Sequence, residues 1–343
     1  MKLINNTNFL LDSYTRLNHN GIEYETVLLK GCFKMVPTSK NEDESWLLRA
    51  AKDQGEFFKK NIHFDNNKKA SVRFEKDHVN FKLTTDLIIN ATAYAPENKP
   101  TKQWEAGIEI GTHKKLLRVI GPRQWKYTNK EWTLTEPKAC LSVPLRYENA
   151  YGGDAKSAKA INLPINNPTG KGVFNTQDIS QSFPAHQIES IDNPIVNANE
   201  VHYPEGFGFI NKKWEPRKSM LAELTNKTKG LPKMVRAGIG HQAANYRGML
   251  MREYLSGTET VTLGNLLPGK SIQKLQLPSL KVSFKSILFP NQQHKGFLPL
   301  ETVVFDIDAK DSEDYRVYLY WRMVHGDSTA IESIEVNAEE VNQ

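Results

Sequence analysis

Apolar and polar residues alternate with a period of two along much of this chain, which limits the fold to one built mainly from β-strands. Near the C-terminus, Val303, Phe305 and Ile307 fall on one face of a strand expected at 302–308. A second strand is expected at 315–324, and the acidic stretch between the two segments suits a turn. This pattern predicts a β-hairpin.

The N-terminal part of the chain shows the same alternation between regularly spaced turns. Strands are expected at 23–33 and near 87–94, followed by a hairpin with strands at 106–110 and 116–120. Turns at this spacing are typical of β-sandwiches and β-barrels. Residues 1–140 are therefore expected to form a β-rich domain.

Residues 141–235 have a different character. Prolines and glycines interrupt this segment every few residues, so long strands or helices are not expected there. Its aromatic residues need burial and argue against disorder. They are Phe174, Phe183, Tyr203, Phe207, Phe209 and Trp214. We expect aromatic-rich loops that pack on a sheet.

The last part of the chain, 236–343, returns to strand patterns after one predicted helix near 241–255. In that helix Tyr246, Met249 and Tyr254 share a face, and Gly257 suits its end. The sequence thus predicts a mainly β fold. Two β-rich lobes, sandwich-like or barrel-like, are joined by a long loop region rich in Pro, Gly and aromatic residues, with few short helices.

The composition is that of an ordinary globular protein, with 24% charged residues. No apolar run reaches the ~18 residues that a membrane helix needs, and the polar N-terminus does not resemble a secretory signal. The two cysteines, Cys32 and Cys140, are far apart and suit a reducing compartment. We expect a cytoplasmic protein without a membrane partner.

Positive charge is spread along the sequence. The formal net charge is +6, from 45 Lys and Arg against 39 Asp and Glu, and the lysines occur in scattered pairs. Nucleic-acid binding usually concentrates such charge on one element. An ordinary solvated surface is therefore favoured and no nucleic-acid partner is expected, while attraction to an acidic protein partner stays open.

No stretch of the sequence carries a recognised catalytic or metal-binding pattern. No two of the nine histidines lie within a helical turn or tight loop of each other, so no metal site is expected. The Gly-Lys-Gly at 170–172 lacks the preceding glycine and the following Ser or Thr of a phosphate-binding loop. There is no Gly-x-Ser-x-Gly nucleophile motif. We expect no cofactor, and a protein that is not an enzyme.

One pair of carboxylates keeps an enzymatic alternative open. Glu148 and Asp154 flank a Tyr-Gly-Gly turn, and two carboxylates at a suitable separation could serve a glycosidase. The favoured interpretation is that Arg146 and Lys156 pair with them at a turn.

The central part of the chain is rich in residues that build stiff, turn-rich surfaces. Arg118 and Arg123 are expected to present guanidinium groups to carbonyls or carboxylates, with Trp125 packed beneath. Trp214 and Arg217 are expected to stack. A rigid surface built from loops is common at recognition sites. The predicted anchors for a partner are Arg123, Trp125, Tyr147, Trp214 and Arg217.

Several motifs, taken in order, resemble the DUF2169 proteins found with bacterial type VI secretion systems. The similarity runs from ETVLLKGCF at 25–33 to LYWR at 319–322. Between them lie RVIGPRQW at 118–125, LTEP at 134–137, PLRYENAYGGD at 144–154, NPTGKG at 167–172 and GFGFINKKWEPR at 206–217. Residues 221–253 resemble the family least and are a candidate for cargo contact.

The resemblance implies a cytoplasmic adaptor or chaperone that binds an effector and helps to load it onto the VgrG/PAAR spike. It carries over no catalytic residues. Two alternatives stay open at this point. One is a carbohydrate-active or sugar-binding β-sandwich protein, and the other is a structural component of the secretion apparatus.

Overall fold

The computed structural model confirms that the fold is mainly β. Among the described residues, short 3₁₀ turns lie at Phe64–Asn66, Pro96–Asn98, Tyr147–Asn149 and Ser312–Asp314. The structure describes residues 1–17, 23–39, 42–79, 82, 84–154, 156–157, 167–200, 202–211, 214, 217, 249, 251–269, 271–327 and 330–341.

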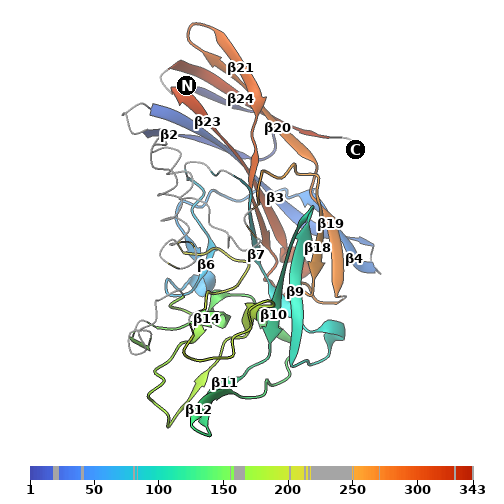
Figure 1. Cartoon of the computed structure of the whole chain (residues 1–343). Coiled ribbons are helices and arrows are strands. Elements are labelled where there is room, and N and C mark those ends of the chain that lie inside the picture. The colour runs from blue at the N-terminus through green and yellow to red at the C-terminus, as the bar shows by residue number, and fades with distance from the viewer. Residues whose placement is uncertain are drawn as a thin grey trace.

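The centre of the molecule is one curved sheet of eleven strands (Figure 1). Ten of them follow the order β17-β10-β9-β18-β19-β4-β3-β23-β22-β7, and β2 pairs with β3 outside this path. Their bounds are β2 Leu10–Leu17, β3 Glu23–Ser39, β4 Glu42–Ala50, β7 Asp86–Asn90, β9 Gln103–Ile110, β10 His113–Ile120, β17 Ile188–Ser190, β18 Thr260–Gly264, β19 Ile272–Gln276, β22 Leu300–Asp306 and β23 Arg316–Asp327.

Both predicted hairpins are present in this sheet. β22 and β23 pair antiparallel, with Val303 opposite Leu319 and Phe305 opposite Val317. β9 and β10 pair in the same way around a turn at 111–112. The N-terminal and C-terminal parts of the chain also share the sheet, because β3 lies between β4 and β23 and β22 lies between β23 and β7.

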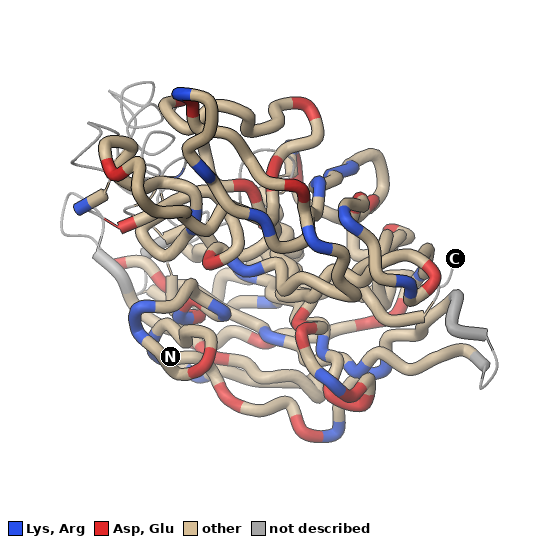
Figure 2. Tube along the Cα trace, turned by 90° about the horizontal axis from the view of Figure 1, so that it is seen from below, with Lys and Arg blue, Asp and Glu red and all other residues tan. Residues whose placement is uncertain are grey.

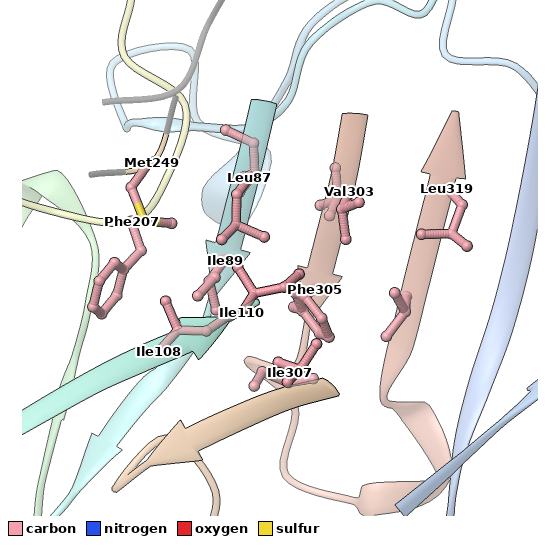
Figure 3. Close-up of a cluster of buried hydrophobic side chains, with 14 of the residues drawn as sticks. Leu87, Ile89, Ile108, Ile110, Phe207, Met249, Val303, Phe305, Ile307 and Leu319 are labelled. Atoms are coloured by element: carbon pink, nitrogen blue, oxygen red, sulfur yellow. The ribbon is translucent and has the colours of Figure 1, made fainter. Parts of the chain in front are cut away.

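Apolar side chains from these strands form the main core (Figure 3). Leu87 and Ile89 of β7 are buried beside Val303 and Phe305 of β22. The other edge of β7 is covered, because the backbone N–H of Ile89 donates to the Phe207 carbonyl at 2.9 Å. The same edge also receives Met249, whose carbonyl accepts from Leu87 N.

Most of the predicted helix at 241–255 lies outside the described residues. Its described end, 251–255, is not helical and instead runs beside β7. Met251 N donates to the Thr85 carbonyl at 3.0 Å, and Leu255 forms an isolated bridge with Leu300. Backbone pairing with the sheet edge takes the place of helical hydrogen bonds there.

A second sheet of four strands lies at the upper end of the molecule in Figure 1. Its order is β1-β24-β20-β21, with bounds β1 Lys2–Asn5, β20 Leu280–Leu288, β21 Gln292–Phe297 and β24 Ile331–Glu340. Val282, Ile334 and Val336 of this sheet belong to the main hydrophobic core. The two sheets are therefore joined by shared packing.

Loops and short strands form the lower end of the molecule in Figure 1. We call residues 121–137, 150–154 and 167–200 the loop lobe. It has a small core of its own, which includes Trp125, Tyr151 and Phe174. Its strands are β11 Gln124–Thr128, β12 Glu131–Leu134, β14 Tyr151–Gly152, β15 Lys171–Gly172 and β16 Ser182–Pro184. Where the structure describes them, the loops at 150–154 and 167–200 pack around this small core.

Strand β3 changes its partner half-way along its length. Its first half pairs with β2 as far as Lys30, and its second half pairs with β4 from Phe33 onward. The Gln54 side chain fills the gap between the two partners: its Oε1 accepts from Cys32 N at 2.7 Å and its Nε2 donates to the Cys32 carbonyl at 3.1 Å. This amide replaces the missing strand and fixes the segment that follows β4.

Candidate partner-binding surface

The glycine-rich motifs of the loop lobe interlock around Asn167. The Asn167 amide donates to the carbonyls of Tyr147 and Tyr151 at 2.7 and 3.2 Å, and Gly153 N donates to the Asn167 carbonyl at 2.9 Å. A Cβ atom at Gly152 would lie 2.1 Å from that carbonyl oxygen. Close backbone contact therefore requires glycine there. The YGGD and NPTGKG motifs form one rigid frame.

A buried carboxylate gathers charged groups from three segments of the loop lobe and its neighbouring strands. Glu189 pairs with Arg118 at 3.1 Å and with Arg123 at 3.2 Å. Its Oε2 also lies 2.9 Å from His186 Nε2, which in turn is 2.7 Å from the Arg123 guanidinium. Arg118 donates to the Ile191 carbonyl as well. The predicted guanidinium contacts of Arg118 and Arg123 are thus confirmed.

The pKa values in this cluster follow from burial and charge. Burial alone would raise the pKa of Glu189, but the hydrogen bond and charge of His186, the N–H of Ile195 and the charge of Arg123 lower it to about 2. Burial and the charge of Arg123 lower the pKa of His186, although its hydrogen bond to Glu189 opposes this shift. Glu189 therefore stays ionised between two arginines.

The charged cluster positions a loop that reaches the surface. Ile195 N donates to Glu189 Oε2 at 3.1 Å, and the Tyr151 hydroxyl donates to the Glu200 carbonyl at 2.9 Å. The segment between these two contacts includes Val196, whose side chain is 71% exposed. Interior hydrogen bonds thus hold an exposed apolar side chain in place.

Aromatic rings connect the interior of the loop lobe with the same surface. Trp125 is fully buried and its ring centroid lies 6.2 Å from that of Phe174. Phe174 packs edge-on against Trp132 at 4.7 Å, and Trp132 packs edge-on against Tyr127 at 5.5 Å. The Trp132 indole N–H donates to the Thr176 carbonyl at 3.0 Å. The outermost rings are therefore fixed from below.

These elements surround a groove of about 560 Å³ on the loop lobe. Trp132 is half-buried in it, and Ile179 on its border is 55% exposed. We call it the Trp132 groove. Its lining residues are Tyr127, Lys130, Glu131, Trp132, Thr176, Ile179, Val196, Asn197 and Asn199. The groove thus combines an aromatic side chain with two exposed apolar residues and a charged rim, features that also occur at protein–protein interfaces.

The structure places the five predicted anchors inside the molecule, in two groups. Arg123 and Trp125 lie beneath the Trp132 groove, as described above. Tyr147 and Trp214 pack edge-on with ring centroids 5.9 Å apart, and the buried Arg217 pairs with Glu75 at 2.7 Å. This second group attaches the GFGFINKKWEPR motif to the large sheet.

Because these side chains lie mostly in the interior, they could support a binding surface but do not form one themselves. The exposed residues of the groove were not predicted. Ile179 and Val196 are single apolar residues within polar loops, and scattered exposed apolar residues are normal in any sequence. Only their position beside Trp132 makes them candidates for contact with a partner.

The structure also describes the two carboxylates considered for sugar chemistry. Glu148 accepts from Ser71 N and from Ser71 Oγ, both at 2.7 Å. Asp154 accepts from Ser157 N at 2.8 Å, as in a turn. Arg146 pairs with Asp308 and Asp65, so the expected Arg146–Glu148 pair is wrong. Glu148 instead ties the 3₁₀ turn Tyr147–Asn149 to Ser71.

Among the described residues, the remaining chemical candidates give no site. Within the described part of the chain, no three His, Cys, Asp or Glu side chains are grouped so as to hold a metal ion. Lys171 of the Gly-Lys-Gly stretch donates to Asn149 Oδ1 at 2.8 Å and joins β15 to the loop before β14. No helix among the described residues is long and apolar enough to cross a membrane.

A family model described as an uncharacterized protein conserved in bacteria (DUF2169) matches residues 20–322. The chain belongs to the DUF2169 family. No curated protein and no solved structure matches it. The DUF2169 span contains the whole loop lobe and the Trp132 groove, whereas β1, β2 and β24 lie outside it. The groove is therefore part of the region that this protein shares with its family.

Proposed function

We propose that this DUF2169 protein is a cytoplasmic adaptor of a type VI secretion system, which binds an effector and helps to load it onto the VgrG/PAAR spike. The secretion role rests on the ordered motifs in the sequence. The observation that carries the binding role is the exposure of Ile179 and Val196 beside Trp132 on a frame of buried ion pairs.

A rigid surface suits an adaptor that must bind and then release its cargo. Pre-formed loops lose little conformational entropy on binding, so a modest contact area gives useful affinity. A specific interface buries about 1,000 Å² or more, with a few aromatic or apolar anchors at its centre. The Trp132 groove would form that centre, and the loops around it would form the rim.

Affinity capture tests this function. The tagged protein is expressed at native level in a bacterium that carries its secretion system, and bound proteins are identified by mass spectrometry. An effector and a VgrG or PAAR protein are expected with the wild type. Val196→Asp and Ile179→Asp should lose the effector, because each places a charge in the apolar part of the interface.

A matched control uses the same change elsewhere. Ile272 of β19 is 54% exposed, close to the value for Ile179, and lies outside the loop lobe. Ile272→Asp should retain the effector. Capture with no effector and no spike protein from the wild type would contradict the proposal, and fractionation of the cells would test the cytoplasmic location.

A second candidate is sugar binding, because aromatic rings and the amides of Asn197 and Asn199 lie together in the Trp132 groove. The Asn197 side chain is already used, since it accepts from Asn199 N at 3.0 Å and donates to Glu200 at 3.1 Å. Protein binding is therefore the favoured function. A glycan array with saturable binding that is lost in Trp132→Ala would favour the sugar.

A further inference from the structure

Three cations stand in register across three neighbouring strands of the large sheet. Lys34 of β3 lies opposite Arg316 of β23 on one side and opposite Arg49 of β4 on the other. Directly opposite residues have Cβ atoms about 5 Å apart, and like charges at such positions destabilise a sheet. A bound anion would offset this repulsion.

The row has no carboxylate partner within the described part of the chain. Lys34 and Arg49 are exposed, and neither takes part in an ion pair there. The Arg316 guanidinium donates to the carbonyls of Glu313 and Tyr315 at 2.6 and 3.0 Å. Elsewhere Lys and Arg are interspersed with Asp and Glu along the chain (Figure 2), so this alignment is a local feature.

The three cations border a groove of about 670 Å³. Cys32 and Tyr318, which are also in register, form its floor next to the cation row. The segment 51–58 forms one wall and adds Lys52 and the Phe58 ring. We call this site the cation groove. One part of it is positively charged, and the other is aromatic and apolar.

The wall of the cation groove is held by three contacts to the sheet. The Gln54 amide bonds both backbone groups of Cys32, as described above. Lys30 Nζ donates to the Glu56 carbonyl at 3.0 Å, and Phe58 N donates to Asp77 at 2.8 Å. The groove is thus formed before any ligand arrives. The Cys32 thiol stays neutral, since burial raises its pKa despite nearby cations.

The charge of the groove selects among anionic ligands. Four cations and two carboxylates, Asp53 and Glu56, line it, so the net formal charge is +2. Asp53 is fixed by the N–H of Gly55 at 2.9 Å. The carboxylates of Asp53 and Glu56 would repel the closely spaced phosphates of nucleic acid. They are compatible with a ligand of a few separated carboxylates, and the apolar floor favours one that also carries an apolar side chain.

We propose that the cation groove docks an acidic segment of a protein partner, with carboxylates on Lys34, Arg49 and Arg316 and one apolar side chain against Tyr318 and Phe58. This site is separate from the Trp132 groove: β3, β4 and β23 are inner strands of the large sheet, whereas β11 and β12 lie at the lower end of the molecule (Figure 1). It does not depend on the secretion role, and it gives the protein a second surface for a second partner.

Fluorescence anisotropy tests the proposal with the full chain. The probe is a fluorescein-labelled peptide of Asp and Glu with one central Phe. The wild type should bind it with an affinity that falls as salt rises. Reversing two cations in Lys34→Glu/Arg49→Glu should weaken binding at least about tenfold, since the groove then repels the peptide.

The control reverses a lysine with neutral neighbours. Lys126 of β11 is exposed and stands opposite Thr133 and Ser182. Lys126→Glu should bind the probe like the wild type. A second readout, the melting temperature, does not require the charge-reversed variant to fold. Lys34→Gln should raise the melting temperature, because it removes like-charge repulsion from the row. Saturating probe should raise the melting temperature of the wild type.

Three results would overturn the proposal. One is equal probe affinity in the wild type and the double variant. Another is failure of the wild type to bind the probe. The third is displacement of the probe by inorganic pyrophosphate or a single-stranded oligonucleotide at lower concentration than by unlabelled peptide, which would assign the groove to phosphate.

Discussion

Glu189 accepts a hydrogen bond from the backbone N–H of Ile195 at 3.1 Å, and this contact links a cluster of charged side chains to the loop that carries the exposed Val196. The carboxylate is held by Arg118 and Arg123, and Val196 follows Ile195 directly. The position of Val196 in the Trp132 groove therefore depends on charged groups in the interior. The cluster around Glu189 can therefore be tested by measuring the stability of variants and their binding to a partner.

Replacing Glu189 with Gln should destabilise the protein. Glu189→Gln keeps the shape of the side chain but leaves two half-buried arginines without their buried carboxylate. The expected cost is about 3 kcal/mol, the lower end of the range for a fully buried pair. Urea unfolding measures the change. The control is Glu97→Gln, because the Glu97–Lys99 pair is exposed on both sides and should contribute nothing measurable. Equal midpoints in the two variants would show that the cluster is not important for stability.

The lowered pKa of the Glu189 carboxylate leads us to expect that the protein loses stability at acid pH. The pKa of Glu189 is lowered from 4.5 in the unfolded chain to about 2 in the folded protein. A lowered folded pKa contributes stability that is present above pH 4.5 and is lost as the pH falls from 4.5 toward 2. The shift corresponds to something on the order of 3 kcal/mol. Melting temperatures across this range should fall steeply in the wild type and less steeply in Glu189→Gln.

Trp125 and Tyr127 should differ in how they affect partner binding. Trp125→Ala removes a fully buried ring and should cost about 3–5 kcal/mol of stability, so binding is lost together with folding of the loop lobe. Tyr127 borders the groove and is half-buried, so Tyr127→Ala should leave the unfolding midpoint nearly unchanged. It should weaken the captured complex about tenfold if Tyr127 is an anchor. Identical loss of stability in both variants would argue against a supporting role for Trp125 and a contact role for Tyr127.

Period-two alternation was enough to predict both hairpins, because each is local and each buries one face. The pairing of β3 with β2 and then with β4 could not be predicted in this way. It depends on Gln54, a polar residue that bonds the backbone of Cys32 across the gap. Nothing in the local pattern around Gln54 indicates such a role.

The candidate site shows the same limit. The sequence indicated that Arg123 contacts a carbonyl or carboxylate, and its partner is Glu189, 66 residues away. The residue type of Arg123 thus allowed its kind of contact to be predicted, but not the identity of its partner. The exposed residues Ile179 and Val196 are not, since their position depends on how the loops pack over Phe174 and Trp132.

Gly152 provides the sharpest test of the rigid frame beneath the groove. In Gly152→Ala the new methyl group would lie 2.1 Å from the Asn167 carbonyl oxygen, so the YGGD and NPTGKG motifs must separate. We expect a loss of at least about 2 kcal/mol, measured by urea unfolding, and weaker effector capture. Gly208→Ala is the matched control, because its methyl group would meet its nearest neighbour at an ordinary 3.7 Å. If both variants unfold at the wild-type midpoint, the motifs do not form the tight frame described above, and the exposed position of Val196 needs another cause.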